Sequence, residues 1–151
     1  SGYKCELVCE FAKELVWEGR LDLLQGDSNG QYHIFSEQLR RLTRLTKFNL
    51  DYVISDSPLL LGAVYTQDSP VSEEFKKIHL YEFSRFDNLN YMLKIRNDAV
   101  YETVGRVHSE IEASIIQAQI FKLLSDNELP YTVLTHENSI SVIQKDLNKT
   151  Y

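Results

Sequence analysis

The sequence predicts a single α/β domain with a mostly parallel sheet, and three observations support this. The chain has 151 residues, the usual length of one domain. It is 43% hydrophobic and 25% charged, a composition typical of a globular protein with a real core. Short apolar runs alternate with longer segments of helical periodicity along the chain, which is the pattern of parallel strands joined by helices.

The central strand is predicted within residues 51–58, with the sequence D-Y-V-I-S-D-S-P. This short apolar run ends in an acid, a hydroxyl and a proline, which is typical of a buried parallel strand whose last residues emerge at the sheet edge. Ligands of open α/β sheets bind outside the carboxyl ends of strands. Asp56 and Ser57 are therefore predicted to lie where a ligand binds.

The other elements follow from periodicity and from stop signals. Three further strands are predicted at residues 4–9, 88–95 and 131–135. Helices are predicted at residues 11–25, 31–48, 59–65, 72–86, 109–127 and 138–149, the fifth beginning with the capping box Ser109-x-x-Glu112. The run G-D-S-N-G at 26–30 predicts a loop, and the aperiodic residues 96–108 predict a functional loop.

Charge and cysteine usage narrow the classes of function. The net charge of −6 argues against a broad basic surface for nucleic acid. No apolar run approaches the roughly 18 residues of a membrane span. Cys5 and Cys9 are predicted to be two buried, reduced thiols, because their C-x3-C spacing within a strand suits neither a disulfide nor zinc. Reduced thiols fit a cytoplasmic location.

Several polar residues are predicted to gather at the sheet edge. Glu10 follows the first strand, with Lys13 one turn further on, and Asp56 and Ser57 follow the second. The remaining candidates are Gln38 and Arg41, three apart on one helix face, and Arg96 and Arg106 in the loop after the third strand. Paired acids with arginines suit phosphoryl transfer, since acids hold Mg²⁺ or accept a proton and arginines neutralise phosphate charge.

Structural interpretations of the same residues remain open. Asp56 is also placed to cap a helix, Glu10 to be a solvated acid of a first helical turn, and Arg41 to belong to a solvated helix face with Arg40 and Arg44. None of the three motifs G-x-x-x-x-G-K-[ST], G-x-G-x-x-G and G-x-S-x-G occurs in these 151 residues.

An ordered set of segments resembles a known family. These segments are Y-K-C-E-L-V-C-E-F-A-K-E-L-V-W, S-E-Q-L-R-R-L, D-Y-V-I-S-D-S-P-L-L-L, F-D-N-L-N-Y-M-L-K and V-G-R-V-H-S-E-I-E-A. Together they resemble the phage and bacterial P-loop NTPases described as nucleotide-kinase-like or AAA-like. The resemblance spans most of the chain, and it implies a three-layer, P-loop-kinase-like fold that uses ATP and Mg²⁺.

The resemblance also implies roles for the candidate residues. Asp56 would be the acid associated with Mg²⁺, with Ser57 beside it at the ATP site, and Glu10 the acid at the acceptor site. Lys13, Gln38 and Arg41 would bind the acceptor. Arg96 and Arg106 would belong to a lid at about residues 96–108 that closes over the phosphates.

The beginning of the sequence departs from this family. Family members have a first strand, a phosphate loop and a helix before the stretch that matches Tyr3-Lys4-Cys5. We therefore expect that a segment of roughly 30 residues, one strand–loop–helix unit, precedes Ser1 in the natural protein. The alternative is a form of the fold without that segment.

Two classes of function are consistent with the sequence. The first is ATP-dependent phosphoryl transfer to a nucleotide or similar small acceptor, or ATP hydrolysis, with Mg²⁺. The second is a non-catalytic module that has lost the phosphate loop and binds a nucleotide or a protein. A phage gene is one source considered for such a module. A homo-oligomer that completes its sheet from a neighbouring chain is compatible with either class.

Overall fold

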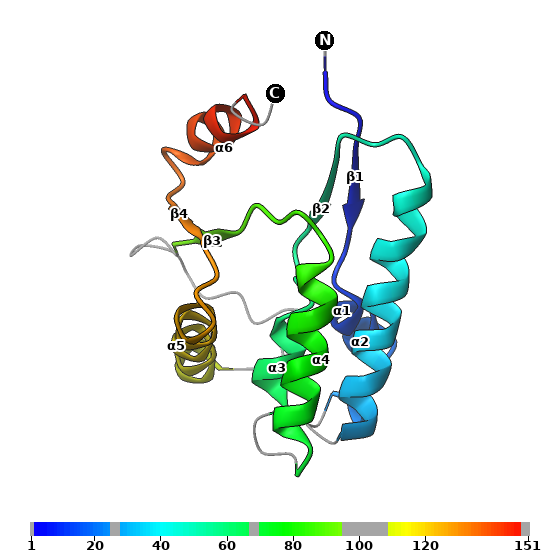
Figure 1. Cartoon of the computed structure of the whole chain (residues 1–151). Helices are drawn as coiled ribbons and strands as arrows, with labels where there is room; N and C mark the ends of the chain where they lie inside the picture. The colour runs from blue at the N-terminus through cyan, green and yellow to red at the C-terminus, as the bar shows by residue number, and fades with distance from the viewer. Residues whose placement is uncertain (1, 25–27, 67–69, 95–108, 149–151) are drawn as a thin grey trace.

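The fold is a mixed α/β arrangement, seen in a computed structural model that describes residues 2–24, 28–66, 70–94 and 109–148 (Figure 1). Its strands are β1 (Cys5–Val8), β2 (Tyr52–Ser55), β3 (Tyr91–Leu93) and β4 (Thr132–Leu134). Its α-helices are α1 (Phe11–Trp17), α2 (Ser28–Thr43), α3 (Leu61–Tyr65), α4 (Ser72–Ser84), α5 (Glu110–Asp126) and α6 (Ser139–Leu147), and two 3₁₀ turns are η1 (Leu21–Leu23) and η2 (Arg44–Lys47). Each strand lies within its predicted range.

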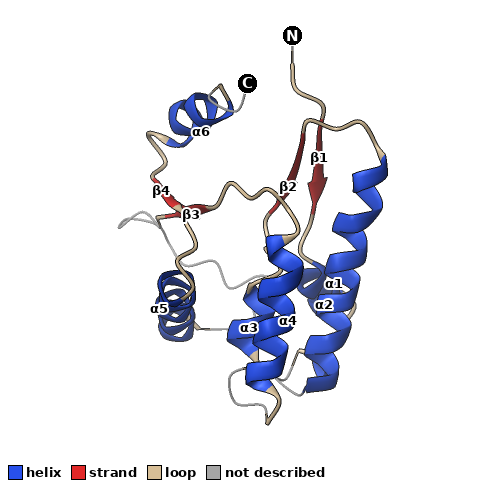
Figure 2. Ribbon diagram, in the orientation of Figure 1, coloured by secondary structure: helices blue, strands red, loops and turns tan. Residues whose placement is uncertain are grey.

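The strands form two separate parallel pairs rather than the one sheet that the sequence predicted. β1 pairs with β2, and β3 pairs with β4. Parallel pairing itself is confirmed in both sheets. Across the molecule the strands follow the order β1, β2, β3, β4, so that β2 and β3 are the inner strands (Figures 1 and 2).

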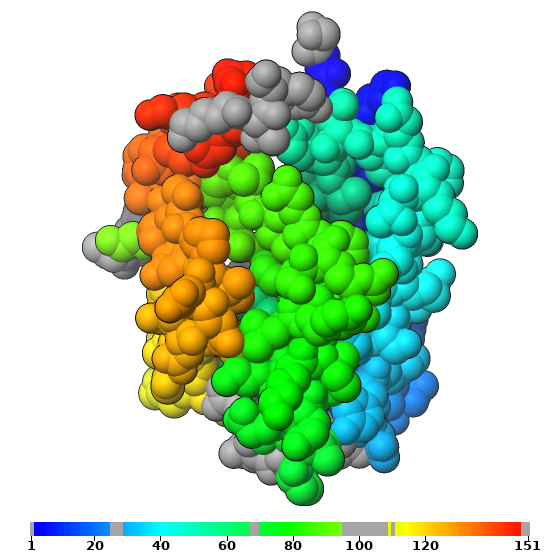
Figure 3. Space-filling model, in the orientation of Figure 1, coloured from blue at the N-terminus to red at the C-terminus, as the bar shows by residue number. Residues whose placement is uncertain are grey.

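The helices α2, α3, α4 and α5 form a layer that supplies most of the core. The main core cluster comes from the α3 region, α4 and α5 and consists of Leu60, Ala63, Val64, Phe83, Leu123 and Leu124. Met92 of β3 packs against this cluster. An aromatic group links α2 to α4, because Phe75 contacts Tyr32 and Phe35 edge to face. Figure 3 shows α4 at the centre of this face, between α2 and the segment from α5 to α6.

Two helix boundaries differ from the predicted ones. The helix predicted at 11–25 ends at Trp17 because Gly19, at φ +72°, adopts the left-handed conformation that closes a helix. The predicted loop at 26–30 is wrong for Ser28 to Gly30, which form the first turn of α2. Gly30 lies directly against the backbone of Leu23, where a larger residue would collide.

Two burial predictions are wrong. The central strand β2 was predicted to be buried, yet its Ile54 is 55% exposed, and Leu7, the register partner of Ile54 in β1, is 60% exposed. Cys5 and Cys9 are free, as predicted, but both are exposed. The strands lie open because the described helices cover one face of this sheet and leave much of the other uncovered.

Other predictions are confirmed or lie outside the described residues. The capping box is present, with Ser109 accepting from the amide of Glu112 and the Glu112 carboxylate accepting from the amide of Ser109. Within the described ranges, none of the helices is both long enough and apolar enough to cross a membrane. The predicted loop at 96–108 falls outside the described residues.

Candidate functional site

The candidate site lies where β1 and β2 end. Val8 and Ser55 are register partners in this parallel pair, so the residues that follow each strand emerge at the same edge. Glu10 follows β1, and Asp56 and Ser57 follow β2. The predicted convergence of these two strand ends is therefore confirmed. β3 ends in the other sheet, and Arg96 and Arg106, which come after it, lie outside the described residues.

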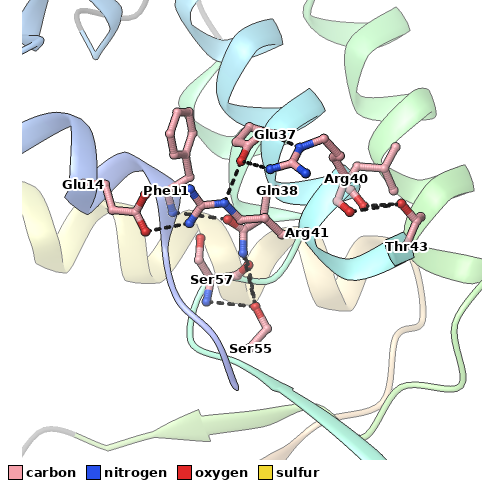
Figure 4. A network of polar contacts seen from close by, with 10 residues as sticks. Phe11, Glu14, Glu37, Gln38, Arg40, Arg41, Thr43, Ser55 and Ser57 are labelled. Atoms are coloured by element: carbon pink, nitrogen blue, oxygen red, sulfur yellow. Dashed lines mark hydrogen bonds and ion pairs between the residues drawn. The ribbon is translucent and has the colours of Figure 1, made fainter. Parts of the chain in front are cut away.

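Gln38 of α2 ties the two strand ends together (Figure 4). Its side chain is buried, at 4% exposure. The amide oxygen accepts a hydrogen bond from the backbone N–H of Phe11 at 3.2 Å, and the amide nitrogen donates to the carbonyl of Ser57 at 3.3 Å. The Phe11 N–H belongs to the first turn of α1, where no helical acceptor is available. Gln38 thus holds the start of α1 at a fixed position relative to the turn after β2.

The turn that follows β2 leaves the side chain of Asp56 exposed to solvent. The hydroxyl of Ser55 donates to the carbonyl of Ser57 at 3.0 Å and accepts from the Gln38 amide at 3.5 Å. Asp56, between the two serines, is exposed. It is not the cap of the next helix, because α3 begins at Leu61 and its N-cap residue is Leu60. The helix-cap interpretation of Asp56 is therefore wrong.

Arg41 lies on the same helix as Gln38 but contacts carboxylates of the protein (Figure 4). Its two terminal nitrogens each donate to one oxygen of Glu14 at 2.6 Å, and its Nε donates to Glu37 at 2.9 Å. The guanidinium carbon also lies 4.8 Å from the ring centre of Phe11. The side chain is 16% exposed, so the interpretation of Arg41 as part of a solvated face is wrong.

The ion pairs around Arg41 lower the pKa values of the acids that take part in them. Hydrogen bonds from Arg40, and also from Arg41, lower the pKa of Glu37 from 4.5 to about 2. A hydrogen bond from Arg41 likewise lowers the pKa of Glu14. The charge of Arg41 is thus balanced by two ionised acids in the folded protein. The cluster fixes α1 against α2 directly behind the strand ends.

Glu10 and Lys13 begin and line the first helix. Glu10 is half-buried and occupies the N-cap position of α1, but its side chain does not cap the helix. Lys13 is exposed in the first turn of α1. Both residues therefore lie on the same element, close to the strand edge that Asp56 reaches from β2.

Sequence reasoning missed three residues of this arrangement: Glu14, Glu37 and Ser55. The spacing of Glu37 and Arg41, four apart on a helix, is a recognisable signal for an ion pair. No such signal joins Glu14 to Arg41, because they are 27 residues apart and meet through tertiary packing. Among the residues that the structure describes, no group of three or more His, Cys, Asp or Glu side chains is placed to hold a metal ion.

Comparison with protein-family models, with curated proteins and with solved structures gives no match to this chain.

Proposed function

We propose that this protein catalyses ATP-dependent phosphoryl transfer to a nucleotide or similar small acceptor, or ATP hydrolysis, with Mg²⁺. The observation that carries the proposal is the meeting of two acidic strand ends, those of Glu10 and Asp56, at one carboxyl edge braced by Gln38. Such an edge is where α/β folds bind ligands. A three-layer arrangement of the P-loop-kinase type is part of the same proposal.

Asp56 is the proposed Mg²⁺ ligand. Its carboxylate is exposed at the end of β2 and offers the hard oxygen that Mg²⁺ prefers. Magnesium in kinase sites is held by one or two carboxylates together with substrate phosphates and water, so a single acid at this edge is sufficient. Ser57 supplies a neighbouring hydroxyl on the proposed ATP side.

Glu10 is the proposed acceptor-site acid. It lies at the neighbouring strand end, where its carboxylate would orient the acceptor hydroxyl or accept its proton. Lys13, exposed one turn further along α1, would supply positive charge to the acceptor. Arg96 and Arg106 would neutralise the transferring phosphate from the proposed lid.

Gln38 and Arg41 could bind the acceptor only if they released their present contacts with the protein. Both ends of the Gln38 amide, and three nitrogens of Arg41, already contact protein groups. A direct contact with an acceptor would require an exchange of these hydrogen bonds. Without such an exchange, the two residues would act by holding Glu10 and Asp56 at the correct spacing.

These occupied contacts favour a second candidate function, a nucleotide- or protein-binding module without catalysis. The two candidates differ in turnover: an enzyme releases ADP in the presence of Mg²⁺ and an acceptor, whereas a binding module shows a ligand-induced rise in Tm without ADP release.

The Asp56→Asn variant tests the proposed enzyme. Asparagine keeps the shape of the side chain but removes the charge that holds Mg²⁺, so ADP release across a nucleotide panel should fall to background while Tm stays unchanged. Asp87→Asn, which alters an exposed acid outside this edge, is the matched control and should keep full activity. Unchanged turnover in Asp56→Asn would remove Asp56 from the mechanism.

A further inference from the structure

A cleft of about 550 Å³ lies between η2 and β1, away from the candidate site. Its lining residues come from β1, from η2 and from the position after η2: Glu6, Arg44, Leu45, Lys47 and Phe48. The volume is within the range of about 300–1,000 Å³ that is usual for ligand-binding sites. η2 lies near the amino ends of β1 and β2, whereas the candidate site lies at their carboxyl ends (Figure 1). The cleft is therefore a second, separate surface.

The two cations of this cleft have no acidic partner in the part of the chain that the structure describes. The other arginines of that part each form an ion pair, namely Arg20, Arg40, Arg41 and Arg85. Arg44 and Lys47 form no ion pair there, although Glu6 lines the same cleft. Both side chains are exposed. Their positive charge is therefore available to a ligand.

Arg44 and Lys47 extend from the same side of η2. They are the first and last residues of this four-residue 3₁₀ turn. Side chains three residues apart in a 3₁₀ helix lie one above the other. Two like charges in this arrangement repel each other, and an anion held between them replaces the repulsion by attraction. The pair is thus arranged to bind one acidic group.

Apolar surface lies beside the two cations. Phe48 is 66% exposed, although aromatic rings are among the side chains that gain most from burial. Leu45, which is half-buried, lines the same cleft. The last turn of a helix favours positive charge. That preference explains cations in η2, but it does not explain an exposed ring next to them. Aromatic side chains and arginine are both enriched where proteins bind each other.

Glu6 and the open shape of the cleft narrow the class of ligand. Side chains alternate along a strand, so Glu6 points to the same face as the buried Val8, toward the helices. Its carboxylate in the lining opposes a long polyanion such as single-stranded nucleic acid, and so does the net charge of −6. The exposed Phe48 leaves the cleft too open to enclose a small molecule. A short acidic peptide with an apolar side chain fits these features.

We propose that the cleft between η2 and β1 binds an acidic peptide segment of a partner protein. A carboxylate of the segment lies between Arg44 and Lys47, and a large apolar side chain packs against Phe48. Glu6 repels a second acid on the opposite wall, which fixes the direction in which the segment binds. The inference goes beyond the proposed function and does not depend on it, because the cleft is not at the carboxyl ends of the strands. Its test measures peptide binding rather than activity.

The probe is a panel of short, dye-labelled peptides in which acids flank one phenylalanine at every spacing, with binding measured by fluorescence anisotropy. At least one acidic peptide should bind. Its counterpart with lysines in place of the acids should bind at least about tenfold more weakly, because two exposed ion pairs are replaced by repulsion. Added salt should weaken binding, since it screens exposed charges. A panel without a single binder at millimolar concentration would overturn the proposal.

A double variant, Arg44→Gln with Lys47→Gln, locates the binding. It should weaken the acidic peptide about tenfold while Tm stays unchanged, because both side chains are exposed. Lys77→Gln with Lys145→Gln is the matched control, since it removes the same charge from two exposed lysines on α4 and α6. The control should bind like the wild type. An equal loss in both double variants would mean that overall charge attracts the peptide, and would overturn the proposal.

A second pair of variants tests the apolar contact. Phe48→Ala should weaken the acidic peptide by about fivefold or more, because it removes the ring on which the apolar side chain packs. Tyr81→Ala is the control, since Tyr81 on α4 is 65% exposed, against 66% for Phe48, and its replacement should leave the affinity unchanged. Unchanged affinity in Phe48→Ala would contradict the proposed contact.

Two other occupants of the cleft have distinct signatures. Binding of an oligothymidine that the Arg44 and Lys47 double variant abolishes, without binding of any acidic peptide, would make the cleft a nucleic-acid site. A dimer that light scattering detects and that the same double variant dissociates would make a second copy of this chain the occupant. Either result would overturn the proposal.

Discussion

His79 is the most completely buried ionisable side chain among the described residues, at 0% exposure. Its Nδ1 lies 2.8 Å from the carbonyl of Phe75, which makes Nδ1–H the donor, and its ring packs against Phe35 and Phe75. Its Nε2 has no partner within the described ranges and faces Gly62, where an added Cβ would collide with it. The pocket therefore accepts a neutral ring, and burial lowers the pKa of His79 from 6.5 to about 4.

This shift predicts an acid-sensitive fold. Above pH 6.5 His79 is neutral in both states and its contribution to stability is complete. As the pH falls from 6.5 to 4, the unfolded chain binds the proton first, and the free energy of unfolding should drop by on the order of 3 kcal/mol. Urea unfolding at pH 7 and pH 4.5 measures the loss, and His79→Phe should reduce it.

The control for this prediction is His136→Gln, which alters an exposed histidine and should leave the pH profile unchanged. If His79→Phe does not fold, an NMR titration of the wild-type ring gives the answer directly. A midpoint near 6.5 for the His79 ring would contradict the account.

The candidate site could be predicted only in part at the residue level. The placement of Glu10 and Asp56 at neighbouring strand ends was predictable because parallel strands end at one edge, a rule that needs no side-chain contacts. Helical spacing predicted that Gln38 and Arg41 lie on the same face of a helix, but it did not predict which groups they contact. Phe11 and Glu14 reach them through the packing of α1 on α2, which no local pattern encodes.

Helix ends carry the clearest information at the level of single elements. After α5, Glu128 takes the left-handed conformation at φ 52°. The amides of Glu128 and Leu129 donate back to the carbonyls of Ser125 and Leu124, the same closing pattern that Gly19 provides after α1. A residue with a Cβ is strained in this conformation, whereas glycine is not.

Glu128→Gly should therefore stabilise the protein by about 1 kcal/mol, because it relieves this strain. Chemical denaturation at neutral pH measures the change. Glu128→Ala is the matched control, since it removes the same side-chain charge but keeps the Cβ. A stabilisation by alanine as large as that by glycine would show that charge, not backbone conformation, determines the effect.

The type of each helix and strand was predicted more accurately than the residues at which it begins and ends. The four runs became four strands because each is short, mostly apolar and bounded by polar residues. The strands are shorter than predicted, since pairing with a single neighbour limits their length. Their exposure was not predictable, because an apolar run does not show which of its faces another element covers.

At the scale of the whole molecule, the parallel α/β character was predictable and the division into two sheets was not. Alternating strands and helices encode parallel crossovers. The same pattern does not encode which strands lie next to each other in the sheet, and β2 and β3 are not paired with each other. The edge shared by β1 and β2 is therefore the part of the sheet on which the functional proposal rests.

The most direct test of this account is a map of backbone amide chemical shifts during titration with nucleoside monophosphates, and with ATP plus Mg²⁺. Enzyme and nucleotide-binding module alike predict chemical-shift changes that are concentrated at residues 9–14 and 55–58. The changes caused by ATP should require Mg²⁺ and should be lost in Asp56→Asn. An absence of shifts at millimolar nucleotide, or shifts confined to α6 and the strand β4, would contradict a nucleotide site at the carboxyl ends of β1 and β2.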